Sequence, residues 1–145
     1  MTESMTIGVV AVLGLAIGSF LNVCIYRLPR GESIVSPPSR CPSCGQALRW
    51  FDNVPVLGWL LLGGRCRSCR AAVSSMYPVV EAATSVVFLL QLWQIGWQPL
   101  LAIRLLFVSA MIVLFVIDLQ HRILPNVITL PGIAVGLLAS VFFEP

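Results

Sequence analysis

Four long apolar segments divide the chain and restrict the folds open to it. They cover residues 5–23, 77–95, 99–117 and 123–143. At about 1.5 Å per residue in a helix, the first of them spans about 28 Å, close to the hydrocarbon thickness of a bilayer. Hydrophobic residues make up 58% of the chain and charged residues 10%, and the mean hydropathy is +0.94. We therefore expect an all-α integral membrane protein with four transmembrane helices.

A cleaved signal peptide is the alternative interpretation of the first segment. Its front end holds Glu3 and no Lys or Arg, and the arginines follow it. We therefore predict a retained helix with its N-terminus outside. Gly14 and Gly18 in this segment, and Gly132 and Gly136 in the fourth, have the spacing that permits close helix packing, although membrane helices are often glycine-rich without it.

The basic residues are distributed unevenly. All nine are arginines, and seven of them lie between the first and second apolar segments. An arginine-rich loop can bind nucleic acid, but the excess of positive charge on cytoplasmic loops explains the same pattern, so we expect no nucleic-acid partner. The bias predicts a cytoplasmic insert, a second cytoplasmic turn at residues 118–124, and both chain ends outside. The predicted parts are the first helix in residues 1–26, the insert in residues 27–76 and the last three helices in residues 77–145.

Two Cys-x-x-Cys pairs lie inside the insert. Cys41 and Cys44 form the first, and Cys66 and Cys69 form the second, with twenty-one residues between the pairs. That spacing is close to the pattern in which four thiolates hold a structural zinc ion and leave no open position. Two disulfides and four free thiols are the alternatives, and a reducing cytoplasm favours zinc over disulfides. An insert of about fifty residues has a thin core, so we expect the metal to hold it together. Cys24 lies apart and is expected to be a small buried apolar residue.

The most apolar part of the insert covers residues 50–62. It is too short and too interrupted to span a membrane, so we expect it either to pack on the cysteine-bearing part of the insert or to lie at the membrane surface. Trp50 and Trp59 suit an interface, and core packing is equally compatible with them. Asp52 and Glu32 are expected to be solvated surface residues.

Two acidic residues, Glu81 and Asp118, lie in or against the later apolar segments. Ionisable groups there are costly and usually functional, and two carboxylates at similar depth can share a proton and activate water. For Glu81 the alternative is a structural ion pair with Arg27 or Arg104. For Asp118 it is a place at a helix end in the headgroup region, although the helix dipole disfavours a carboxylate at the C-terminal end. His121 is expected to be an interfacial residue rather than a ligand.

These features occur together with a set of short motifs. The motifs are GSFLNVCIYRLP at residues 18–29, PSRCPSC at 38–44, WFDNVP at 50–55, GRCRSC at 64–69, YPVVE at 77–81, and ID at 117–118 with LPN at 124–126. Together they resemble the type IV prepilin peptidases over nearly the whole chain, from about residue 18 to residue 131. The set as a whole is highly specific.

The resemblance implies a multi-pass enzyme of the bacterial inner membrane. Such aspartic endopeptidases cut the positively charged leader from type IV prepilins and type II secretion pseudopilins on the cytoplasmic side. Many also methylate the new N-terminus with S-adenosylmethionine, a role linked to the insert, and the family's Cys-x-x-Cys pairs bind zinc. Asp118 matches the family's first catalytic aspartate. Asn22, Arg27 and Glu81 fall in the shared motifs and are candidate substrate- or cofactor-binding residues.

The sequence departs from the family pattern at two points. The family's second catalytic aspartate lies in a Gly-x-Gly-Asp motif within additional helices, and this sequence, which ends at Pro145, has no such motif. Asn126 stands where an aspartate is common. The chain thus resembles the N-terminal half of a prepilin peptidase, and we expect it to need a second-half subunit or a homodimer to complete the aspartate pair. The alternatives are Glu81 in the role of the missing aspartate, or a non-catalytic zinc-containing membrane protein that binds prepilin-like helices or assembly partners.

Overall fold

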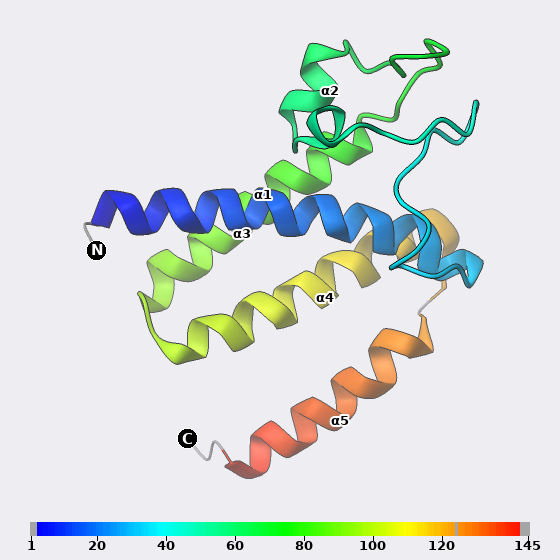
Figure 1. Ribbon diagram of the computed structural model, residues 1–145. Helices are drawn as coiled ribbons and strands as arrows, with labels where there is room; N and C mark the ends of the chain where they lie inside the picture. Colours follow the sequence, from blue (N-terminus) through cyan, green and yellow to red (C-terminus); the bar gives the residue numbers. More distant parts are fainter. Residues whose placement is uncertain (1–2, 124, 143–145) are drawn as a thin grey trace.

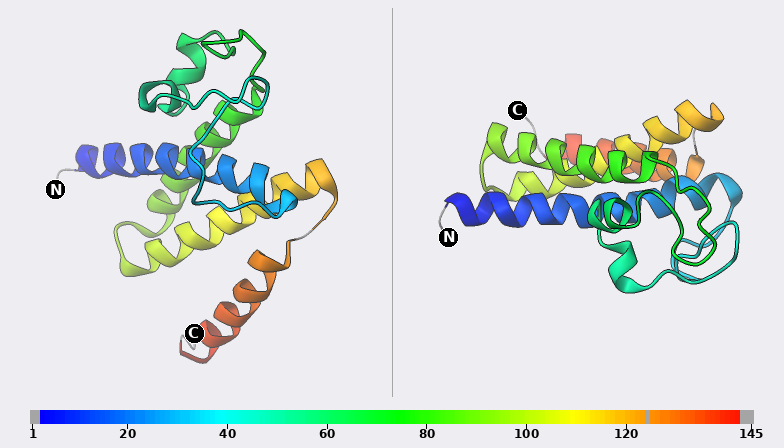
Figure 2. Two further views of the ribbon diagram at one scale, coloured as in Figure 1. Left: turned by 45° about the vertical axis from the view of Figure 1, so that its right-hand side comes forward. Right: turned by 90° about the horizontal axis from the view of Figure 1, so that it is seen from above.

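Four helices and an insert make up the computed structural model, which describes residues 3–123 and 125–142, apart from the side chains of residues 139–142. The insert lies between the first two long helices and stands on one side of the bundle (Figures 1 and 2). It contains the short helices η1 (Leu28–Arg30), η2 (Trp50–Asn53) and α2 (Leu57–Leu61). The long helices are α1 (Glu3–Arg27), α3 (Met76–Ile95), α4 (Pro99–His121) and α5 (Asn126–Phe142).

Three of these helices, α1, α3 and α4, are long and apolar enough to cross a membrane. The expectation of an all-helical fold with long apolar helices is therefore confirmed. The last helix, α5, is apolar but shorter, so the fourth span stays a prediction. The expected limits of that span, and of the turn before it, fall partly on residues 124 and 143, which lie outside the described residues.

Two helices continue past the ends of their apolar segments. α1 runs to Arg27 rather than to residue 23, and α4 runs to His121 rather than to residue 117. The end of α4 is set by Arg122, which has left-handed backbone angles (φ 54°, ψ 40°) and whose N–H donates to the carbonyl of Asp118. Asp118 thus lies at the C-terminal end of α4, as expected, but within its last turn rather than in the predicted turn at residues 118–124. An apolar run ends where polar residues begin, but polar residues can continue a helix beyond it.

Close contact between α1 and α3 depends on two glycines. A Cβ atom placed on Gly14 would lie 2.5 Å from the Cα atom of Ser85, and one placed on Gly18 would lie 2.7 Å from the Cα atom of Glu81. Real Cβ atoms do not approach backbone this closely, so any larger residue would push the helices apart. The close-packing interpretation is therefore confirmed for these two positions.

The corresponding interpretation for α5 was wrong. Nothing described lies within 4 Å of a Cβ atom placed on Gly132 or Gly136. Ile128, in the first turn of α5, packs against the apolar core. Most of α5 lies away from α1 (Figure 1).

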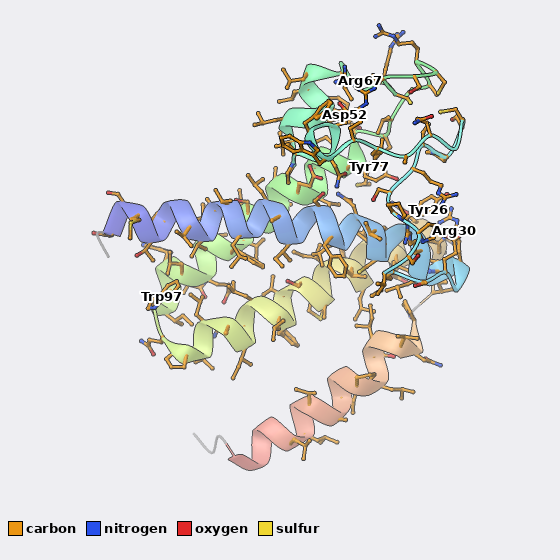
Figure 3. The ribbon with its side chains drawn as sticks, viewed as in Figure 1. Tyr26, Arg30, Asp52, Arg67, Tyr77 and Trp97 are labelled. Carbon is orange, nitrogen blue, oxygen red and sulfur yellow. The ribbon has the colours of Figure 1, made fainter. Side chains whose placement is uncertain are left out.

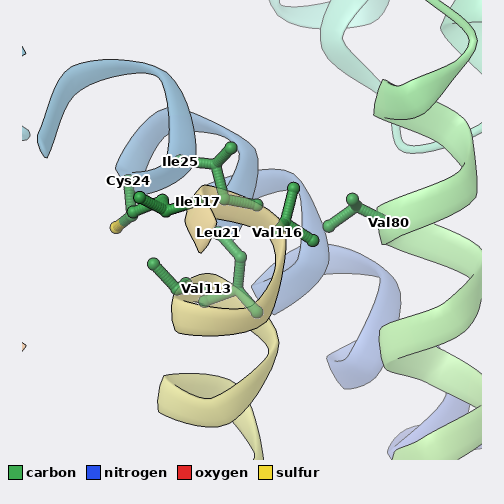
Figure 4. Packing of buried hydrophobic residues seen from close by; sticks show 7 residues of the cluster. All are labelled: Leu21, Cys24, Ile25, Val80, Val113, Val116 and Ile117. Atoms are coloured by element: carbon green, nitrogen blue, oxygen red, sulfur yellow. The ribbon is translucent and has the colours of Figure 1, made fainter. Parts of the chain in front are cut away.

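An apolar core joins α1, α3 and α4 (Figure 4). Cys24 belongs to it and is 7% exposed, so its predicted role as a small buried apolar residue is confirmed. Val80 and Ile117 share this cluster, so their neighbours Glu81 and Asp118 lie at the same end of the bundle. The buried members are Leu21, Cys24, Ile25, Val80, Val113, Val116 and Ile117.

Candidate metal centre and adjoining pocket

Each Cys-x-x-Cys pair folds into the same tight turn. The N–H of Gly45 donates to the carbonyl of Cys41 at 2.9 Å, and the N–H of Arg70 donates to the carbonyl of Cys66 at 3.0 Å. The residue after the second cysteine has a positive φ in both turns, 71° for Gly45 and 59° for Arg70. The two turns are therefore structurally equivalent, and each presents two thiols to the same point.

The four thiols of the pairs meet between the two turns. The Sγ atoms of Cys41, Cys44, Cys66 and Cys69 all lie within 4.8 Å of one another, and those of Cys41 and Cys69 are 3.8 Å apart. Cys41 and Cys66 are buried, whereas Cys44 and Cys69 are exposed. All are free thiols, so the structure does not contain the two disulfides of the alternative interpretation. The four cysteines are positioned to hold a metal ion.

The protonation of this cluster is uneven. Backbone N–H groups of Cys44 and Ser43 lower the pKa of the Cys41 thiol to about 6. For Cys69 the backbone N–H of Ala71 also acts to lower the pKa, but desolvation and the neighbouring thiols outweigh it and raise the pKa to about 11. Thiols this close cannot all ionise unless a cation compensates their charge, which is the situation that favours metal binding.

An ion pair joins the second cysteine turn to η2 (Figure 3). The Nη2 atom of Arg67 lies 2.6 Å from Oδ1 of Asp52, and its Nε atom lies 3.0 Å from both carboxylate oxygens. The hydrogen bonds from Arg67 hold the pKa of Asp52 below its usual range. Because the Asp52 side chain is only 5% exposed, the prediction of a solvated surface residue was wrong. The carboxylate instead fixes η2 against the metal centre.

A pocket of about 600 Å³ lies between the insert and the neighbouring ends of α1 and α3. Asn22 and Arg27 line it from α1, and Glu81 lines it from α3, so the structure brings these three predicted residues together. Cys41 and Cys66 form part of the same wall. The charged lining consists of five arginines and three carboxylates: Arg27, Arg40, Arg49, Arg65, Arg67, Glu32, Asp52 and Glu81.

Glu81 connects this pocket to the insert. Its Oε2 atom accepts a hydrogen bond from the backbone N–H of Val56 at 2.6 Å, and the side chains of Ser19 and Asn22 also interact with the carboxylate. The amide of Asn22 donates in addition to the carbonyl of Tyr77 at 3.0 Å. Sequence reasoning could not predict the Val56 contact, because a backbone donor is not encoded by a residue type.

The alternative interpretation of Glu81, an ion pair with Arg27 or Arg104, was wrong. Within the described part of the chain, the ion pair found is Arg67–Asp52. The Arg27 guanidinium instead donates to two loop carbonyls, that of Ser33 at 2.8 Å and that of Pro37 at 2.6 Å. The two carbonyls thus accept the hydrogen bonds of Arg27, and the backbone N–H of Val56 donates to Glu81 in place of an arginine.

Asp118 lies apart from this pocket. It is exposed in the last turn of α4 and is not among the residues that line the cavity. His121 is exposed one turn further on. Glu81 and Asp118 thus lie at one end of the bundle, but the structure does not bring them into one site.

Comparison with known proteins also separates the part of the chain that forms the pocket from the part that contains Asp118. Residues 12–95 match the model of the bacterial peptidase A24 N-terminal domain, and residues 105–145 match that of the type IV leader peptidase family. The first match contains most of α1, the insert and α3, and the second contains most of α4 and all of α5. No solved structure matches the chain.

Several curated proteins are similar in sequence. A prepilin leader peptidase/N-methyltransferase of Myxococcus xanthus is 48% identical over 126 residues, which cover 87% of this chain and 38% of the relative. The protein of the same name from Pseudomonas aeruginosa is 35% identical over 153 residues, covering 90% and 53%. A type 4 prepilin-like proteins leader peptide-processing enzyme of Escherichia coli is 42% identical over 149 residues, covering 88% and 54%. The chain thus spans about half or less of the length of these relatives.

Proposed function

Because this chain belongs to the type IV leader peptidase family of bacteria, we propose that it forms part of a membrane aspartic endopeptidase that cleaves the leader peptides of type IV prepilins and pseudopilins. The observation that carries the proposal is the match of two family models to most of the chain, from residue 12 to residue 95 and from residue 105 to residue 145. The apolar helices support placement in the bacterial inner membrane, with the arginine-rich insert on the cytoplasmic side.

Asp118 supplies one carboxylate of the catalytic pair in this proposal. It would polarise a water molecule for attack on the scissile carbonyl. Its exposure in the last turn of α4 supports this role, because an extended substrate segment can reach it there. The second carboxylate comes from a further segment, a second subunit or a second copy of the chain.

The cysteine cluster holds a structural zinc ion in this proposal. Four thiolates at about 2.3 Å from zinc are separated from one another by about 3.8 Å, and the Cys41–Cys69 separation of 3.8 Å fits that arrangement. Four protein ligands fill the coordination shell, so the metal stabilises the insert and leaves no position for substrate.

The pocket beside the metal centre suits the second reaction that the relatives' names include, N-methylation. A carboxylate such as Glu81 complements a cationic amine or sulfonium, and the surrounding arginines complement a carboxylate. We propose that Asn22, Arg27 and Glu81 bind the new N-terminus or S-adenosylmethionine. When bound, that cofactor supplies the methyl group.

Leader cleavage tests this proposal. A prepilin-type peptide is incubated in detergent with the purified chain, alone and together with the additional helices that carry a Gly-x-Gly-Asp motif. We expect cleavage with the added helices, and a loss of about 100-fold or more in Asp118→Asn, since an acid–base group contributes that much. Glu3→Gln, an acid-to-amide change in the first turn of α1, is the control and should leave the rate unchanged.

Absence of cleavage by the folded, metal-loaded mixture would contradict the enzymatic role. It would favour the alternative, a non-catalytic membrane protein that binds prepilin-like helices or assembly partners. Cleavage by the chain alone that is lost in Asp118→Asn would locate the second carboxylate within this chain or its dimer, and Glu81→Gln would be measured next.

A further inference from the structure

The short helix α2 has an apolar face that no described residue covers. Leu57 and Leu60 are each 57% exposed, and Leu61 is 84% exposed. In contrast, Gly58 is buried against the backbone of Asp52 in η2. The helix therefore has a fixed inner side and an outer side of three leucines.

A hydrogen bond to α3 fixes the depth of this face relative to the bundle. The N–H of Val56, the residue directly before α2, donates to Oε2 of Glu81 at 2.6 Å. Glu81 is the sixth residue of α3, about 8 Å along the helix from its start. A 20-residue helix is about 30 Å long, which is just the thickness of the hydrocarbon core. The second turn of α3 therefore lies within one leaflet, and the beginning of α2 is held at that level.

A second contact fixes the orientation of α2. The indole N–H of Trp59 donates to the carbonyl of Val73 at 3.0 Å, and its ring lies against Gly64. Trp59 thus points into the insert and towards the segment that leads into α3. Figures 1 and 2 show α2 at the outer part of the insert, on the opposite side of the bundle from α5.

We propose that α2 is an in-plane membrane anchor, whose side chains Leu57, Leu60 and Leu61 insert into the leaflet on the side of the insert. Lipid is the occupant that the position of α2 favours, because the face lies at the depth of a membrane-spanning helix. At the same depth Val79 on α3 is 57% exposed, as a helix residue in contact with lipid would be. The exposed Arg49, directly before η2, suits phosphate headgroups near such a helix. The anchor would hold the metal centre and the pocket against the bilayer surface.

Photo-crosslinking in vesicles tests the proposal. The full chain, with p-benzoylphenylalanine in place of Leu61, is reconstituted into phosphatidylethanolamine–phosphatidylglycerol vesicles, irradiated and analysed by mass spectrometry. The control carries the same amino acid in place of Val35, which is 88% exposed in the loop after η1 and lies outside the proposed anchor. Both variants are compared with the unmodified chain for equal melting temperature in detergent, so that a folding defect is recognised.

We expect at least fivefold more lipid adduct at position 61 than at position 35. Equal yields at the two positions, or no lipid adduct at position 61, would overturn the anchor. A crosslink from position 61 to a second copy of the chain would also overturn it and would assign the leucine face to a dimer interface. None of these outcomes depends on peptidase activity, so the anchor and the proposed function are tested separately.

Discussion

Arg70 adopts a backbone conformation that its structural equivalent, Gly45, adopts more easily. Both follow the second cysteine of a pair, with φ of 59° and 71°. A left-handed conformation costs a non-glycine residue about 1 kcal/mol or more. We expect Arg70→Gly to stabilise the metal-bound insert by about 1 kcal/mol, which is about a fivefold change in an equilibrium constant. The measurement is the chelator concentration that removes half of the metal.

Gly45→Ala is the matched change in the opposite direction and should lower that chelator concentration. If Arg70→Gly lowered the chelator concentration as well, the Arg70 side chain would stabilise the insert by more than its backbone conformation costs.

The spacing of the four cysteines predicted that they form one site, because a tetrahedral site needs only suitable ligand types at suitable distances along the chain. The partner of Glu81 could not be predicted in that way, since it is a backbone N–H placed by the tertiary fold.

At the scale of elements, the contact of α1 with α3 controls the position of Glu81. A Cβ atom on Gly18 would lie 2.7 Å from the Cα atom of that residue. We therefore expect Gly18→Ala to separate the helices and to destabilise the bundle by about 1–3 kcal/mol, as overpacking does. Thermal unfolding in detergent measures the effect. Gly8→Ala is the control, because no described atom lies within 4 Å of the added Cβ. An equal melting temperature for both variants would contradict the packing argument.

The bounds of a helix could be predicted accurately only where particular residues mark its ends. For α3 the expected range of residues 77–95 differs from Met76–Ile95 by one residue, because Pro78 and Gly96 mark the two boundaries. No such residues mark the ends of the apolar runs in α1 and α4, and both helices continue for another turn. The short helix α2 could not be predicted, because five residues are too few to show a helical period. Its position is set instead by contacts with η2, Val73 and Glu81.

For the molecule as a whole, the bundle and the insert have different sources of stability. The bundle has the apolar core shared by α1, α3 and α4, whereas the insert is organised around four thiols. We expect a chelator to unfold the insert while the long helices persist, because the core contains no metal ligand. Far-UV circular dichroism should change little, and limited proteolysis should cut within residues 31–75.

Zinc added back should restore the protease resistance of the chelated chain, and calcium, which prefers oxygen ligands, should not. Loss of most helical signal on chelation would show instead that the bundle depends on the insert. The apolar segments predicted long helices on either side of an insert. They did not predict the pocket between the insert and the bundle, which exists only because α1, α3 and the cysteine turns meet.

The contacts of Arg27 have a consequence for how the protein is made. In the folded protein its guanidinium donates to the carbonyls of Ser33 and Pro37, and the residue is only 8% exposed. Before the loop folds, the same side chain is a free positive charge directly after α1, and we expect that charge to favour a cytoplasmic position for the insert. We therefore expect one residue to act twice in succession, first as a charge that biases the orientation of α1 and then as a hydrogen-bonding centre. A lysine in its place would retain the first role, because it keeps the charge, and lose the second, because it lacks the planar fork of donors.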